Sequence, residues 1–208
     1  MKRYVLRGAL YLGGASFLAL GVQLAIISNL GAGSFDAMYA NLHHLLQSRL
    51  FPGLSLGTTM ALTMVVLYII AMILKPRFYY LFGFGLSVFT GAMIDLFGLI
   101  IPEVQILPFR VLYYLLALVC IAFGVALIIK SKFPLTPMDN LMMIVVEKTK
   151  KPVALIKTLL DLLYAAIAIL FGYLGGIGFG AVNLGSIIMA FLMGPLINIF
   201  LKVLKTEK

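Results

Sequence analysis

The residues best suited to chemistry in this chain are a few carboxylates and amides set among long apolar runs. Asp36 and Asp139 each follow a short turn that interrupts such a run, and Asp95 lies inside one. A carboxylate at hydrocarbon depth is costly and usually marks a path for a solute, an ion or a proton. We therefore expect a solute-binding site made from Asp36, Asp95, Asp139, Asn198, Tyr39, His43 and Asn140.

The segment that carries Asp36 occurs twice. NLGAGSFDAM at residues 29–38 has its counterpart in KFPLTPMDNL at residues 132–141, so a shift of 103 residues places Asp36 on Asp139. The same shift places a ladder of small residues that ends in a polar group, Gly83, Ser87, Gly91 and Asp95, on Ser186, Ala190, Gly194 and Asn198. The chain therefore has two sequence repeats, at residues 8–101 and 109–202.

Composition indicates a membrane protein. Apolar residues make up 63% of the 208 residues and charged residues only 11%. Several runs reach the roughly 20 residues that a helix needs to cross a bilayer. We predict an all-α, polytopic, single-domain membrane protein with six spans, at about 8–29, 54–74, 80–101, 109–130, 153–175 and 183–202.

Each repeat also contains a short helix after its first span. Residues 34–48 would form a helix of only about 22 Å, which is too short to cross the membrane and should re-enter it or lie at its surface. Asp36, Tyr39 and His43 share one face of this helix. In the second repeat, Thr136 and Asp139 match a capping box with proline at the first helical position.

Charge placement predicts the orientation. If the N-terminus is cytoplasmic, the opposite side receives only Arg49 and Arg110, while the cytoplasmic side receives Lys2, Arg3, Arg7, Lys75, Arg77, Lys130, Lys132, Lys148, Lys150, Lys151, Lys157, Lys202, Lys205 and Lys208. Both termini are then inside. The net charge of +9 follows from this topology and favours contact with anionic lipids. A basic groove with stacking aromatics, as in nucleic-acid binders, is missing.

Three spans per repeat is an odd number, so the second repeat should cross the membrane in the opposite direction. Inverted repeats of this kind are typical of secondary transporters, whose sites lie near the midplane at broken or re-entrant helices.

Simpler structural roles exist for the same acids. Asp36 and Asp139 lie in first helical turns, where a carboxylate favours the exposed N–H groups and the helix dipole. Asp161 follows Lys157 by four residues and is expected to form a structural ion pair. Asp95 has no Lys or Arg in its neighbouring turns, so we expect it to face the other repeat and its neutralisation to affect function more than folding.

No metal or cofactor site is indicated. His43 and His44 are adjacent and therefore point about 100° apart on a helix, which specifies no ligand cluster. The single cysteine, Cys120, lies within a span and cannot form an intrachain disulfide.

The chain resembles the YczE/YyaS/YitT family of bacterial membrane proteins, most closely its YczE-like branch. The resemblance is carried by LGAGSFD, by its second copy FPLTPMD and by MGPLINIF near the end, and it covers nearly the whole chain. The second copy departs from the pattern, with methionine before its aspartate and Pro134 and Thr136 in place of glycines. The family implies a multi-pass protein of the bacterial inner membrane.

Three functions follow as hypotheses. The first is a small-solute transporter for a cation, an organic amine or a proton-coupled solute, with its site between the repeats. The second is the substrate-binding membrane subunit of a larger energy-coupled importer. The third is an accessory membrane protein that assembles with itself or with a membrane partner through its small-residue faces. An enzyme is not expected, because GxSxG, HExxH and Walker-type motifs are absent.

Overall fold

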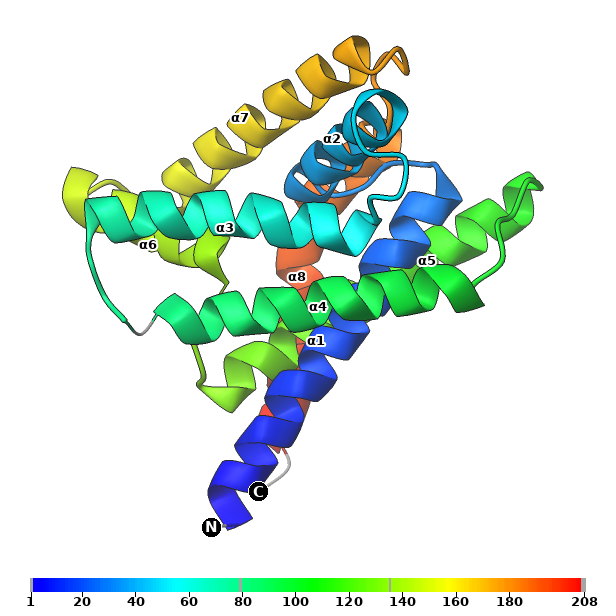
Figure 1. The fold of residues 1–208 in the computed structure, drawn as a ribbon. Helices are drawn as coiled ribbons and strands as arrows, with labels where there is room; N and C mark the ends of the chain where they lie inside the picture. Colours follow the sequence, from blue (N-terminus) through cyan, green and yellow to red (C-terminus); the bar gives the residue numbers. More distant parts are fainter. Residues whose placement is uncertain (1, 79, 135, 207–208) are drawn as a thin grey trace.

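The computed structural model describes residues 2–78, 80–134 and 136–206, and these form eight helices without strands (Figure 1). The predicted all-α class is confirmed. Leu135 and Lys208, which the sequence argument uses, lie outside the described residues. The helices are α1 (Lys2–Ser28), α2 (Ser34–Arg49), α3 (Leu56–Leu74), α4 (Tyr80–Ile100), α5 (Leu107–Ser131), α6 (Pro137–Thr149), α7 (Val153–Leu174) and α8 (Leu184–Thr206).

Six of the helices are long and apolar enough to cross a membrane. These segments are Tyr4–Ser28, Leu56–Leu74, Tyr80–Ile100, Leu107–Ser131, Leu155–Leu174 and Leu184–Leu204. They agree with the six predicted spans to within a few residues. The other two helices are short, with 16 residues in α2 and 13 in α6. The predicted short helix of the first repeat ends at Arg49, one residue later than expected.

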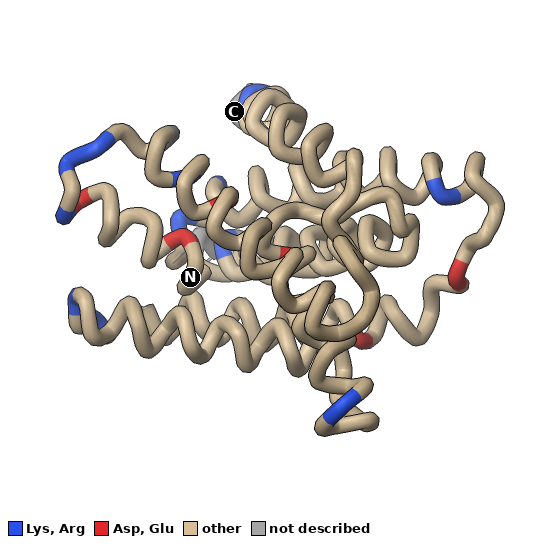
Figure 2. Tube along the Cα trace, turned by 90° about the horizontal axis from the view of Figure 1, so that it is seen from above, with Lys and Arg blue, Asp and Glu red and all other residues tan. Residues whose placement is uncertain are grey.

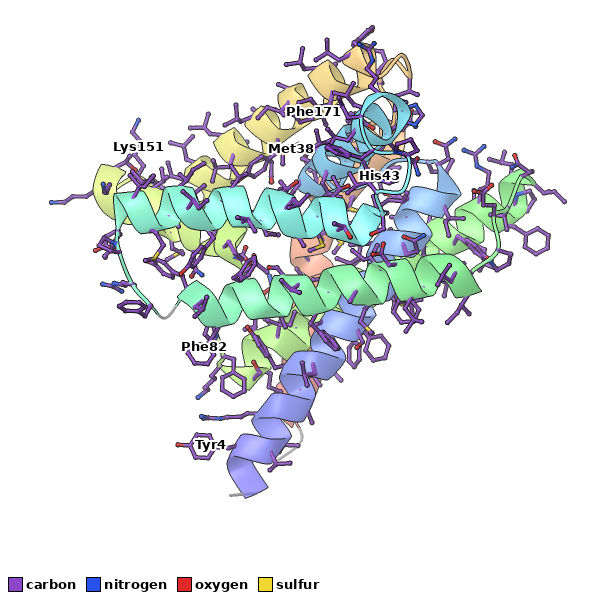
Figure 3. The ribbon with its side chains drawn as sticks, viewed as in Figure 1. Tyr4, Met38, His43, Phe82, Lys151 and Phe171 are labelled. Atoms are coloured by element: carbon purple, nitrogen blue, oxygen red, sulfur yellow. The ribbon has the colours of Figure 1, made fainter. Side chains whose placement is uncertain are left out.

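The surface of the bundle is apolar, as expected for contact with lipid. Phe82, for example, projects away from the helices and is 70% exposed (Figure 3). The buried core instead contains residues from all eight helices. Met38 of α2 belongs to this core and the partly buried Phe171 of α7 packs against it, where those two helices meet (Figure 3).

Helices α1 and α5 approach each other at their backbones. A Cβ added to Gly14 would lie 2.8 Å from the carbonyl oxygen of Gly124, and one added to Gly124 would lie 2.6 Å from that of Gly14. Two turns further along α1, a Cβ added to Gly21 would lie 2.9 Å from the carbonyl oxygen of Ala117. Gly14 and Gly21 correspond to Ala117 and Gly124 under the 103-residue shift, so each contact is the counterpart of the other.

The ends of α1 and α5 carry the same local structure. The hydroxyl of Ser28 donates to the carbonyl of Ala25 and accepts a hydrogen bond from the N–H of Leu30. In the same way, the hydroxyl of Ser131 donates to the carbonyl of Ile128 and accepts from the N–H of Phe133. The next residues, Asn29 and Lys132, adopt positive φ of 52° and 60°. A left-handed residue after a helix directs the chain out of the helical path, so both turns begin in the same way.

Helix packing is also reciprocal between the halves. α2 packs on α7 and α6 on α3; α1 packs on α4 and α5 on α8; α2 packs on α3 and α6 on α7. Among the described residues, three packed pairs have no counterpart of similar extent, namely α3–α4, α4–α6 and α1–α2, and α3–α4 is the most extensive of them. α3 packs along α4, whereas α7 and α8 are not packed along their lengths in the part of the chain that the structure describes.

The α3–α4 contact contains Asp95 and corrects two expectations about it. Gly57 and Gly91 meet at their backbones, and a Cβ on Gly91 would lie 2.6 Å from the carbonyl oxygen of Gly57. The Asp95 carboxylate accepts hydrogen bonds from the N–H of Gly57 at 2.7 Å and from the hydroxyl of Ser55 at 2.6 Å. Asp95 is therefore neither unpartnered nor turned toward the other repeat. The small residues do bring a helix close, but that helix is α3 of the same repeat.

Lys and Arg lie mainly at helix ends and in loops (Figure 2). Lys75, after α3, forms an ion pair with Glu147 near the end of α6, so these two ends lie at the same side of the molecule. The Lys75 ammonium holds the pKa of the exposed Glu147 carboxyl below its usual range. Helix α1 begins and helix α8 ends at the same end of the molecule in Figure 1, although Figure 2 shows these two ends separated in depth.

Substitution of Gly14 by alanine tests the α1–α5 contact. The added methyl group meets backbone atoms of α5, which cannot yield locally, so we expect a loss of about 1–3 kcal/mol and a lower unfolding temperature in detergent. The neighbouring Gly13→Ala is the matched control, because a Cβ on Gly13 meets no atom within 4 Å. Equal unfolding temperatures for the two variants would contradict the contact.

Asp95→Asn tests the role of the α3–α4 contact. An amide can accept from only one of the two donors and turns its own N–H₂ toward the other, so we expect a loss of about 1–3 kcal/mol of stability. The control is Glu103→Gln, which neutralises an exposed loop carboxylate. A stable Asp95→Asn protein that had lost only its activity would restore the original functional interpretation.

Candidate functional site

Helix α2 begins deep inside the protein. The ring of Phe35, in its first turn, lies 5.4 Å from that of Tyr164, and Asn41 donates to the carbonyl of Ala168 at 2.8 Å. Later residues of α2 thus meet later residues of α7, and the two helices run parallel. Tyr164 lies midway along the apolar span Leu155–Leu174, so the start of α2 lies at the middle of that span.

The turn before α2 docks against the start of α8. The N–H of Gly185 donates to the carbonyl of Leu30, and the N–H of Ala32 donates to that of Ala181. Gly31 has a φ of 128°, and a Cβ there would lie 2.5 Å from the backbone nitrogen of Ser186. Glycine is required on both counts. These contacts place Asp36 in the first turn of a helix whose N-terminus faces protein.

Helix α6 begins in the way the capping box predicts. The hydroxyl of Thr136 donates to the Asp139 carboxylate at 2.8 Å and also accepts from the Asp139 N–H at 3.4 Å. Asn140, next to it, is buried, and its N–H donates to the carbonyl of Thr136. Asp139 therefore has a structural hydrogen bond, whereas Asp36 makes none within normal geometry in the described part of the chain.

Asp36 and Asp139 both interact with the same two charged residues of α7, Lys157 and Asp161. Lys157 and Asp161 both interact electrostatically with Asp36, and both interact with Asp139. The Lys157 ammonium is bonded to the Asp161 carboxylate at 3.0 Å, which confirms the predicted i,i+4 pair. The start of α6 and residues Lys157 to Tyr164 of α7 line one cavity, and the start of α2 packs on the same part of α7 through Phe35 and Tyr164. We call Asp36, Asp139, Lys157, Asp161 and Tyr164 the α7 cluster.

A small cavity lies within the α7 cluster. Its volume is about 50 Å³, which is room for water. It is lined by Met138, Asp139, Met142, Lys157, Leu160, Asp161 and Tyr164. The Lys157 side chain is 58% exposed, so the cluster is reached from the end of the molecule at which α7 begins.

Two tyrosine hydroxyls in this region are buried without hydrogen-bond partners, those of Tyr39 and Tyr164. The Tyr39 side chain is fully buried, and its hydroxyl lies near the Asp36 carboxylate without reaching hydrogen-bond geometry. Tyr164 lines the cavity and interacts electrostatically with Asp161 and Asp139. Buried polar groups are normally satisfied, so such orphans call for a specific explanation.

The charges of the α7 cluster do not balance. Asp36, Asp139 and Asp161 face the single ammonium of Lys157. The two helix N-termini favour negative charge, by at most about 2 kcal/mol each. Burying an uncompensated carboxylate costs several kcal/mol, so the helix dipoles do not offset the excess. The cluster is therefore suited to take up positive charge.

The remaining predicted residues lie elsewhere. His43 is within 3.3 Å of the Thr59 hydroxyl and interacts with Asp95, so it belongs to the α3–α4 contact region and not to the α7 cluster. The predicted polar face of α2 is thus divided between α7 and α3. Asn198 is exposed on α8. Sequence reasoning predicted the Lys157–Asp161 pair from its i,i+4 spacing but gave it a structural role only, and it missed Tyr164 altogether.

The described residues contain no group of three or more His, Cys, Asp or Glu side chains placed to hold a metal ion. A multidentate metal centre therefore has no support in this part of the chain.

Comparison with known proteins places the chain among bacterial membrane proteins of unknown role. It is 28% identical over 195 residues to the uncharacterized protein YyaS of Bacillus subtilis, covering 92% of this chain and 90% of that protein. It is 30% identical over 185 residues to the uncharacterized membrane protein YczE of the same organism, covering 87% and 81%. No solved structure matches. Residues 5–202 match the family of unknown function DUF6198, and the chain belongs to that family.

Proposed function

We propose that the protein is a small-solute transporter of the bacterial cytoplasmic membrane, with the α7 cluster as its central site. One observation carries this proposal. Asp36 and Asp139, equivalent residues of the two repeats, both lie in the first turns of short helices, and both of these helix starts pack on the part of α7 that carries Lys157, Asp161 and Tyr164. Sites at the broken helices of two related halves are the arrangement that many secondary transporters use.

The two halves are proposed to be inverted repeats. The reciprocal α1–α5 contact and the exchange of α2 onto α7 and of α6 onto α3 support a twofold relation. The odd number of spans per repeat reverses their direction. With the Lys-rich ends of α3 and α6 in the cytoplasm, both termini are cytoplasmic as well. The lipid bilayer is then the surrounding medium, and the solute is a small molecule or ion.

The asymmetry between α3–α4 and α7–α8 supports a transport cycle. The Gly57–Gly91 contact closes the end away from Lys75, which is the outer end in this topology. Its counterpart in the second repeat would close the inner end, but a Cβ on Gly194 meets no atom within 4 Å. We propose that the α3–α4 pair is closed at the outer end and that the α7–α8 pair is open at the inner end. Rocking of one half against the other would exchange these contacts. A cavity of about 360 Å³, lined by Asn29, Asn41 and Gly180 among others, also lies at the outer end between α1, α2 and the α7–α8 loop.

A second candidate is a membrane subunit that works with a partner, either within an energy-coupled importer or as a homo-oligomer. The observation that favours it is the surface of α8, which exposes large apolar side chains along its length, including Leu184, Ile187 and Phe191. These side chains face lipid in the transporter proposal. Co-purification of an ATPase with the protein would instead identify them as a docking surface.

The transport proposal predicts solute-dependent currents that need both repeat aspartates. Purified protein in liposomes on a solid-supported membrane should give transient currents with members of a series of small amines from methylammonium to choline. We expect Asp36→Asn and Asp139→Asn each to reduce these currents at least about tenfold. This corresponds to the loss of about 1.4 kcal/mol of interaction between the aspartate and the solute. Currents that persist in both variants would rule out the α7 cluster as the site.

The same variants separate function from folding. Asp36 makes no hydrogen bond within normal geometry, so Asp36→Asn should leave the unfolding temperature unchanged or raise it, unlike Asp95→Asn. A strong destabilisation by Asp36→Asn would mean that the carboxylate is structural.

The inward-open assignment is tested by cysteine labelling in a Cys120→Ala background. A cysteine at Gly194 should react with a membrane-impermeant maleimide in inside-out vesicles and not in right-side-out vesicles. A cysteine at Val66, which is 55% exposed near the middle of α3 and faces lipid in this topology, is the control and should react slowly. Equal, slow labelling at both positions would mean that α8 faces lipid at Gly194 and that no inner opening exists there.

A further inference from the structure

The α7 cluster contains more negative charge than its single ammonium neutralises. The Lys157 ammonium is bonded to Asp161 at 3.0 Å, and that leaves Asp36 and Asp139 without a cation of their own. The ionisable groups that act on Asp36 are Tyr39 of its own helix and Asp161 and Lys157 of α7. Those that act on Asp139 are Lys157, Asp161 and Tyr164, all from α7.

Two properties of the cluster restrict what it can bind. In the state that the structure describes, the cavity of about 50 Å³ has room for water but not for an organic amine, so an amine could enter only after the rocking of the two halves proposed above. The described residues also lack a group of three carboxylate or imidazole side chains placed to hold a metal ion. A proton meets both restrictions, because it needs one carboxylate oxygen and no cavity of its own.

The unpartnered hydroxyl of Tyr164 is a second and independent sign of a ligand at this place. Its side chain is 96% buried, as only 4% is exposed, and it lines the same cavity as Asp139 and Asp161. A phenol can both donate and accept, so it can bond to a carboxylate or to a protonated carboxyl group. Tyr39 stands in the same relation to Asp36.

We propose that the α7 cluster binds a proton, carried by Asp36 or Asp139, and that the Lys157–Asp161 ion pair sets its affinity. In the state that the structure describes, the proton exchanges with the end at which Lys157 is exposed. This inference rests on the transport site proposed above, and it identifies the coupling ion of that site. When Lys157 stays paired with Asp161, its charge is shared and the other carboxylates hold the proton more tightly. If Lys157 turns away from Asp161 toward them, the proton is released.

The proton is tested without knowing the solute. N,N′-dicyclohexylcarbodiimide is apolar and adds to carboxylic acids that are protonated and shielded from water. Purified protein in detergent should be modified at Asp36, at Asp139 or at both, as identified by peptide mass spectrometry, and the extent should fall as pH rises from about 5 to about 9. Asp95, whose charged form accepts two hydrogen bonds, should stay unmodified.

Variants of the ion pair should shift the pH midpoint of this reaction in opposite directions. Lys157→Gln removes the only nearby cation and should raise the midpoint by about one pH unit. Asp161→Asn removes a like charge and frees the ammonium, so the midpoint should fall by a similar amount. Lys157→Arg keeps the charge and is the matched control, with a midpoint near that of the unaltered protein.

The carbodiimide reaction can either support or overturn the proton site. Modification that depends on pH and shifts in these two directions supports the proton site. No modification of Asp36 or Asp139 in folded protein, modification independent of pH, or midpoints that do not separate Lys157→Gln from Asp161→Asn would overturn it. If the reaction fails while amine currents still need both aspartates, the transport site stands without a proton. If the reaction behaves as expected and no solute moves, the proton site stands and the transport proposal fails.

Discussion

The chain must turn back after α1 and start α2 in the protein interior, and the structure depends on how the backbone groups of this turn are paired. At the end of α1, the Arg110 guanidinium donates to the carbonyls of Ser28 and Asn29 at 2.6 and 2.7 Å. The N–H of Gly185 donates a hydrogen bond to the carbonyl of Leu30. With these groups paired, α2 can begin at mid-depth and place a carboxylate there.

The interior helix starts also explain why the charged residues are so few and so grouped. A buried carboxylate is tolerated where a helix N-terminus, a hydroxyl or an ammonium opposes its charge. Asp139 has Thr136, Asp161 has Lys157 and Asp95 has Ser55 with Gly57. Asp36 has its helix start, the nearby hydroxyl of Tyr39 and the Lys157 ammonium that is already bonded to Asp161. It is the least compensated acid of the set, which is why the proposed chemistry centres on it and on its counterpart.

The sequence predicted the helices well, because length, apolarity and the repeated turn are local properties. It also predicted the Lys157–Asp161 pair, since residues four apart on a helix are neighbours. It could not predict that this pair belongs to the site, because the packing of α2 on α7 joins residues more than 120 positions apart. The prediction that Asp95 faces the other repeat was wrong for the same reason. Its partners, Ser55 and Gly57, lie at the start of the preceding helix, and they are within reach only because the backbones of Gly57 and Gly91 are in contact.

The central claim is that the aspartates of both repeats share one ion pair, and double-mutant cycles in thermal unfolding test it most directly. Lys157→Gln would be measured alone and combined with Asp36→Asn and with Asp139→Asn. If Lys157 opposes both carboxylates, its loss should be less damaging once either aspartate is neutral, with coupling above about 0.5 kcal/mol in each cycle. Additive effects in both cycles would show that the two aspartates do not meet at Lys157, and the shared site would be wrong.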